Sequence, residues 1–148
     1  MENKVSDIGF ALHKITTEQF AIIEENFSEK GNMRLGTNFR FGIDNKQKAI
    51  AVFTAFTFEA DAKPFLIIEA GCYFHIQDTT WQQMLNNDTH TLIVPKNLMS
   101  HLVMLTVGTT RGILHAKTEN TCFNRYVIPT INVNEMIKED VILDFDVR

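Results

Sequence analysis

A chain of 148 residues and 17.0 kDa has the length of one domain that buries a hydrophobic core. The composition, 45% hydrophobic and 22% charged, is ordinary for a soluble globular protein, and a net charge of −4 without a basic cluster argues against nucleic-acid binding. The first residues lack the apolar core of a signal peptide, and Pro95, Lys96 and His101 interrupt the longest apolar stretch. We therefore expect a cytoplasmic protein without membrane insertion.

The first half of the chain carries the alternation of extended strands. Short segments rich in Gly, Asn, Asp and Pro separate these strands, which predicts an antiparallel meander rather than βαβ units. The predicted strands are residues 10–15 and 20–27, with 16–18 between them as a bend or as a bulge within one long strand, then residues 33–44, 49–59 and 65–76.

The last two of these strands are apolar on both faces, whereas the chain has helices enough to cover one face of a sheet. The uncovered face would then present Phe53, Phe65, Ile67 and Tyr73 as a large apolar patch, and such patches usually mark an interface. We therefore predict that these four residues form an oligomer interface, in a homodimer or a larger homo-oligomer.

A long helix is predicted to begin at Pro95, since proline is favoured at the first helical position, and to run to about Lys117. Gly108, Thr109 and Thr110 are poor helix formers, so the alternative is a break or a strand across residues 103–109. The expected buried stripe is Leu98, Leu102, Leu105, Ile113 and Ala116, widened by Met99, Val103 and Val107.

Two shorter helices are predicted over residues 78–85 and 133–138. Residues 1–9 and 139–148 are expected to be loose tails, although the last eight residues alternate weakly and an edge strand is the alternative. The whole prediction is one α+β domain over residues 1–148, with a four-stranded antiparallel sheet and a long and a short helix packed on one face.

No catalytic or metal-binding pattern is present. The five histidines and two cysteines form no HExxH motif and no pair four residues apart, and no Ser or Cys lies in a nucleophile elbow. Cys72 is expected to pack as a small hydrophobe, and Cys122 to be more exposed. We therefore expect no enzyme activity, no metal and no cofactor.

Residues 108–112 read Gly-Thr-Thr-Arg-Gly and match neither a P-loop nor a dinucleotide-binding fingerprint. We interpret them as a point of tight packing between the helix and its surroundings. An ion pair between Arg111 and Glu69 is a further hypothesis, based only on the expected contact between strand and helix.

The linker between the long helix and the last helix is unusually apolar for a loop, and loops normally lie at the surface. Its side chains must therefore either plug the core or line a groove for extended, unfolded polypeptide, for which aromatic and Met side chains offer adaptable contacts. These residues are Phe123, Tyr126, Val127, Ile128, Ile131, Met136 and Ile137.

Residues 91–137 resemble the corresponding part of SecB, the bacterial protein-export chaperone. The matching features are Pro95 at the start of the long helix, the Arg111-Gly112 pair, and the segment Pro-Thr-Ile-Asn-Val at 129–133. The resemblance implies a SecB-like α+β fold that assembles as a dimer of dimers, a homotetramer. It further implies a protein-transport chaperone that holds preproteins unfolded in apolar grooves and passes them to the SecA motor. The implied groove residues are Phe123, Tyr126, Val127, Ile128 and Ile131, together with Phe74.

The chain also departs from SecB. It has Ile-Val-Pro-Lys at 93–96 where SecB commonly has Leu-Phe-Pro-Tyr, and Gly-Ile-Leu-His at 112–115 where Gly-Thr-Phe-Pro is usual. The last eight residues hold neither Cys nor His, the residues with which many SecB proteins bind the zinc that docks on SecA. The expected function is thus a holdase for export or for a dedicated client, as in antitoxin or mobile-element systems. The alternative is a non-catalytic domain that binds a small ligand or mediates oligomeric interactions.

Overall fold

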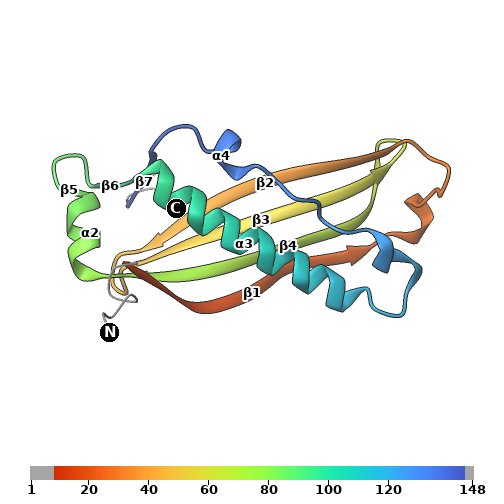
Figure 1. Cartoon of the computed structure of the whole chain (residues 1–148), viewed down its shortest axis with the longest axis horizontal. Helices are drawn as coiled ribbons and strands as arrows, with labels where there is room; N and C mark the ends of the chain where they lie inside the picture. The colour runs from red at the N-terminus through yellow and green to blue at the C-terminus, as the bar shows by residue number, and fades with distance from the viewer. Residues whose placement is uncertain (1–8, 146–148) are drawn as a thin grey trace.

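Four long strands form the main sheet of the computed structural model, which describes residues 9–145 (Figure 1). The α+β fold predicted from the sequence is confirmed. The strands are β1 (Phe10–Ile22), β2 (Met33–Asp44), β3 (Ala49–Ala60), β4 (Lys63–Ile76), β5 (Leu85–Asn86), β6 (Thr91–Val94) and β7 (Val141–Asp144). The helices are α2 (Asp78–Met84), α3 (Lys96–Lys117) and α4 (Val133–Met136), with the 3-10 turns η1 (Glu24–Asn26) and η2 (Cys122–Arg125).

The main sheet is antiparallel with the order β1-β4-β3-β2. Strands β2, β3 and β4 form the predicted meander, whereas β1 pairs with β4 and lies at the edge opposite β2. Residues 23–32 therefore cross the end of the sheet from one edge to the other (Figure 1). Strand β1 is one strand with two register shifts, as the bulge hypothesis allowed, and it ends at Ile22 rather than Phe27.

One face of the sheet is covered by α3, which packs on β3 and β4 along most of their length (Figure 1). Side chains from the two layers fill the space between them at close to zero exposure, among them Ile50, Val52, Phe56, Ile68, Phe74, Met99, Leu102 and Val103. Within this apolar layer Thr110 Oγ donates to the carbonyl of Thr106, so Thr54 Oγ donates to Thr110 over 2.6 Å. This chain of hydroxyls satisfies the two buried side chains of Thr54 and Thr110 and fixes the register of α3 on the sheet.

Helix α3 runs without a break through Gly108 to Lys117, as predicted, but its buried face is rotated from the predicted stripe. Leu105 and Ala116 are exposed, whereas Thr106, Thr110 and Leu114 are buried. The apolarity pattern missed the threonines because a Thr hydroxyl that donates to the carbonyl four residues earlier has no unpaired donor left to bury.

The interpretation of residues 108–112 as a point of tight packing is wrong for both glycines. A Cβ atom placed on Gly108 or Gly112 would have no atom within 4 Å outside the helix itself, because both residues lie on the outer face of α3. Neither glycine is therefore required by packing within this chain.

The uncovered face of the sheet does not expose the predicted patch. Phe53 lies flat over Gly71, where a Cβ would come within 2.6 Å of the Phe53 ring carbons, and the Arg40 guanidinium stacks on the ring with its carbon 4.0 Å from the centroid. Arg40 Nε donates to Glu69 Oε2 over 2.9 Å, and Lys14 covers the Tyr73 ring at 4.8 Å. Long charged side chains thus cover the aromatic rings of this face.

Two of the four predicted interface residues are corrected by this arrangement. Phe65 points to the helix side of the sheet and is fully buried, because the register shift after Phe58 turns the start of β4. Phe53 is buried by its own chain, whereas Ile67 and Tyr73 are half-buried on the uncovered face. The apolar surface on which the oligomer prediction was based is therefore much smaller than expected.

A second, three-stranded sheet with the order β5-β6-β7 was not predicted. The apolar residues just before Pro95 form β6, and residues 141–144 pair with it as β7, which confirms the edge-strand alternative for this part of the tail. Gly9 accepts a hydrogen bond from Gln77 N, and residues 1–8 and 146–148 lie outside the described residues. Among the described helices, none is long and apolar enough to cross a membrane.

Candidate functional site

Five aromatic rings gather where α3 ends and the crossover segment, residues 126–132, begins. Phe65 lies at the centre, with ring centroids 5.0 Å from Phe27, 5.1 Å from Tyr126 and 6.1 Å from Phe123. Phe27 also contacts Phe123 at 5.1 Å, and Phe58 contacts Tyr126 at 5.8 Å. These edge-to-face and tilted contacts hold the start of the crossover segment to the sheet.

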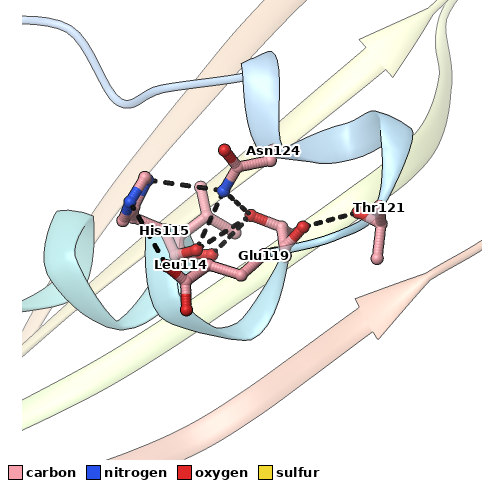
Figure 2. A network of polar contacts seen from close by, with 6 residues as sticks. Leu114, His115, Glu119, Thr121 and Asn124 are labelled. Carbon is pink, nitrogen blue, oxygen red and sulfur yellow. Dashed lines mark hydrogen bonds and ion pairs between the residues drawn. The ribbon is translucent and has the colours of Figure 1, made fainter.

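A polar network fixes the C-terminal end of α3 to η2 (Figure 2). Thr118 Oγ donates to the carbonyl of Leu114 over 2.8 Å, and Thr121 Oγ donates to the carbonyl of Thr118 over 2.7 Å. Asn124 Nδ2 reaches back to the carbonyl of His115 at 3.0 Å. The last carbonyls of the helix are thereby paired, and the crossover segment leaves from a fixed position.

Arg125 links Tyr126 to Glu29 next to this network. Its Nη2 donates to the Tyr126 hydroxyl over 3.1 Å and lies 3.2 Å from Glu29 Oε2. The hydrogen bond to Tyr126, with a smaller contribution from Glu29, raises the pKa of Arg125 above its ordinary value.

Arg111 ties the crossover segment to α3. Its Nε donates to the carbonyl of Ile128 over 2.7 Å, and its Nη2 donates to the carbonyl of Pro129 over 2.8 Å. The hypothesis of an Arg111–Glu69 ion pair is wrong, because Glu69 lies on the other face of the sheet and pairs with Arg40. Arg111 thus acts on the backbone of the crossover segment rather than on a carboxylate.

The structure separates the six predicted groove residues into two groups. Phe74, Phe123 and Ile128 are buried and belong to the core, so the prediction that they line an open groove is corrected. Phe74 faces the core because even-numbered residues of β4 point toward α3. Phe123 comes from η2 and Ile128 from the crossover segment, and both belong to the same core.

Tyr126, Val127 and Ile131 form the second group, at the surface. Val127 is 55% exposed, and Tyr126 and Ile131 are half-buried. Figure 1 shows the crossover segment running back beside α3 toward its N-terminal half. The assignment of Tyr126, Val127 and Ile131 to a groove stays a prediction, and the exposure of Val127 supports it.

Two exposed methionines extend this surface. Met104 is 50% exposed and lies seven residues before Arg111, which places it within about 20° of the same side of α3 and therefore toward the crossover segment. Met136, at the end of α4, is 47% exposed. We call the exposed and half-buried apolar residues of this region the crossover surface: Met104, Tyr126, Val127, Ile131 and Met136.

A second exposed apolar strip, the β1 flank, consists of Leu12, Ile15 and Leu105. Leu12 and Ile15 pair with Phe74 and Cys72, whose side chains lie in the core, so both point to the helix side of the edge strand. Leu105 lies on α3 about 120° from Arg111. This strip combines apolar side chains with a long strand edge on the side of α3 away from the crossover surface.

A cleft of about 1130 Å³ lies between the end of β2 and β7. Phe41, Ile43, Tyr73 and Leu143 contribute apolar lining, together with Ile142, which is the most exposed large apolar side chain among the described residues. Polar groups of the β2–β3 turn also line the cleft. The cleft combines two strand edges but gathers no cluster of catalytic or metal-binding side chains.

Met104 and the β1 flank escaped the sequence prediction. Met104 and Leu105 belong to a helix whose buried face could not be placed correctly from apolarity alone, because two threonines take core positions. Leu12 and Ile15 are three residues apart, which would place them on opposite faces of a regular strand. The register shift between Leu12 and Lys14 brings both to the helix side, where the edge position of β1 exposes them.

The chain was also compared with known proteins. No protein-family model matches it, and no curated protein is similar enough in sequence to count as a match. A solved structure that it resembles is the Mycobacterium tuberculosis Rv1957 SecB-like chaperone in complex with a ChAD peptide from the Rv1956 HigA1 antitoxin. The TM-score is 0.51 at 9% sequence identity, over 87% of this chain and 100% of that chain.

A protein of unknown function from Streptococcus agalactiae is also similar, with a TM-score of 0.37 and 16% identity over 83% of this chain and 97% of that chain. The first similarity, together with the observed order of strands and helices, defines the architecture. The chain has the fold of a SecB-like chaperone.

Proposed function

We propose that this protein is a SecB-like holdase that binds unfolded polypeptide in the cytoplasm and catalyses no reaction. The observation that carries the proposal is the crossover surface, where Val127, Met104 and Met136 are each about half exposed. Exposed apolar clusters of this kind mark interaction sites.

The chemistry of the crossover surface suits a variable client. Methionine is unbranched and polarizable, so it adapts to side chains of different shape, and Tyr126 adds a flat ring with a polar edge. Arg125 and Arg111 lie beside these residues and are cations, which suits segments that also carry acidic groups. The fold similarity to a chaperone that holds a peptide points in the same direction.

The alternative function, a small-ligand pocket enclosed by the Phe-rich sheet and the long helix, is not favoured. The side chains that would line such a pocket, including Phe56, Ile68 and Leu102, are fully buried against one another. Space for a ligand between the sheet and α3 would require a different packing of this core.

We further propose that the protein forms a homo-oligomer, a dimer or a tetramer, through the β1 flank. A long edge strand with exposed apolar side chains is a ready template for pairing with a second strand, which would cover Leu12 and Ile15. Delivery to SecA is not part of the proposal.

Val127→Asp is expected to weaken the binding of an unfolded, apolar client peptide at least tenfold, measured by fluorescence anisotropy. Burying a valine is worth about 1.5–3 kcal/mol, and a carboxylate in its place must also be desolvated. The thermal unfolding midpoint should stay close to that of the unchanged protein, because Val127 packs against little of its own chain.

Thr130→Asp is the matched control, since Thr130 is an exposed polar residue of the same segment. It adds the same charge and should leave affinity within about twofold. Equal affinity of Val127→Asp, Thr130→Asp and the unchanged protein would contradict the assignment of the crossover surface.

A further inference from the structure

We propose that the crossover segment is a clasped flap: Arg111 is the clasp, Ile128 is a plug in the core, and an apolar side chain of a bound polypeptide displaces that plug. This inference rests on the proposed function for the identity of the polypeptide. The clasp itself follows from the contacts of Arg111 and Ile128.

The backbone of the crossover segment has few attachments. Within residues 9–145, no backbone–backbone hydrogen bond involves residues 127–131. The carbonyls of Ile128 and Pro129 are held by Arg111, and the amide groups of Val127, Ile128, Thr130 and Ile131 have no partner among the described residues. One guanidinium therefore supplies the hydrogen bonds that hold the middle of the segment to the rest of the chain.

The side chains of the crossover segment show the same pattern. From Tyr126 to Asn132 only Ile128 is buried, at 1% exposure, while Val127 on one side and Pro129 on the other are exposed. Ile128, together with the partly buried Ile131, and one arginine thus hold the centre of the segment closed.

The two ends of the segment are better anchored than its centre. Tyr126 packs in the aromatic cluster around Phe65, and Val133 is 1% exposed at the start of α4. The six residues between these two anchored points, 127–132, can lift without unfolding either anchor, because no ladder of hydrogen bonds has to break.

Lifting the segment would remove Ile128 from the core and leave an apolar slot among the other residues of the core cluster. A client side chain in that slot would restore the lost apolar contacts, so binding would favour the lifted state. The buried position of Ile128 then describes the unoccupied state of the same binding site.

Thiol labelling tests this flap directly. In a Cys122→Ser background, which removes the exposed native cysteine, Ile128→Cys reports lifting of the flap, and the native Cys72, buried in β4, reports opening of the core. A maleimide reagent is added, and intact and digested protein is followed by mass spectrometry. We expect Arg111→Gln to accelerate labelling at position 128 at least tenfold and to leave labelling of Cys72 unchanged.

Arg125→Gln is the matched control, because Arg125 contacts Tyr126 and Glu29 but no carbonyl of the segment's centre. It should not accelerate labelling at position 128. Equal acceleration by the two substitutions, or labelling of positions 128 and 72 at one common rate, would overturn the clasp. Thermolysin cleavage at the Val127–Ile128 bond of the chain with its native Ile128 provides the same comparison, should Ile128→Cys disturb the core.

The plug is tested with the same unlabelled cysteine variant, Ile128→Cys in the Cys122→Ser background. Its labelling rate is measured with an unfolded apolar peptide and, as reference, with a polar peptide of equal length. The apolar peptide should bind and accelerate labelling at position 128, whereas the polar peptide should do neither. An apolar peptide that binds without changing this rate would overturn the plug and leave the proposed function intact. An apolar peptide that does not bind would overturn both the proposed function and displacement by a client, while the Arg111→Gln comparison still decides the clasp.

Discussion

Phe65→Ala is expected to lower the free energy of unfolding by about 3–5 kcal/mol, measured by urea denaturation followed by circular dichroism. Phe65 is fully buried, and its ring contacts Phe27, Phe123 and Tyr126 at once. Removing it leaves a cavity at the point where the sheet, η1 and the crossover segment meet, so the loss includes the aromatic contacts of three separate elements.

Ile67→Ala provides the comparison, because Ile67 lies two residues after Phe65 in β4 and faces the uncovered side of the sheet, where it is half-buried. Its cost should be about 1 kcal/mol, well below that of Phe65→Ala. Similar costs for the two variants, or a loss of oligomer mass without a loss of stability in Phe65→Ala, would restore Phe65 as an interface residue and contradict the core described above.

Ile128→Asp is expected to destabilise the fold by at least about 3 kcal/mol, measured in the same denaturation experiment. The Ile128 side chain is 1% exposed in an apolar layer. A carboxylate at this position would therefore be buried among apolar side chains that donate no hydrogen bond to it. Arg111 does not relieve this cost while its Nε and Nη2 donate to the Ile128 and Pro129 carbonyls.

Val127→Asp is the neighbouring control and should change stability by about 0.5 kcal/mol or less, since the residue is exposed. The two variants therefore separate folding from binding. Ile128→Asp should lower the free energy of unfolding, whereas Val127→Asp should lower the affinity for the client. Two variants of equal stability would show that Ile128 does not plug the core.

Local patterns carried much of the fold prediction. Regular alternation located β2, β3 and β4 to within a few residues, and Pro95 marked the start of α3. The place of β1 could not be predicted, because β1 pairs with β4 across more than forty residues of chain and a local turn signal at 29–32 suggested β2 as its neighbour. The second sheet was missed for the same reason, since β7 pairs with β6 about fifty residues away.

The candidate site could be predicted in its location but not in the orientation of its side chains. The apolar linker after α3 does lie at the surface of the chain, where Val127 is exposed. Arg111 donates hydrogen bonds to the carbonyls of Ile128 and Pro129, and Ile128 points toward the core where the backbone is held in this way. A side chain that binds backbone carbonyls leaves no signal in the sequence, so the inward direction of Ile128 could not be predicted.

The uncovered face shows a similar limit. Counting apolar residues in β3 and β4 suggested a patch that needs a partner, but Arg40 stacks on Phe53 and Lys14 covers Tyr73. Aliphatic stems and guanidinium planes cover apolar rings well, although such residues count as polar in any pattern.

Size-exclusion chromatography with light scattering, on the protein mixed with a chemically unfolded client, tests most directly whether this chain binds unfolded polypeptide. The client is expected to co-elute with the protein, and the mass of the protein alone is expected to be a multiple of 17.0 kDa. A protein that elutes at 17.0 kDa with the client absent from its peak would contradict both the holdase and the homo-oligomer.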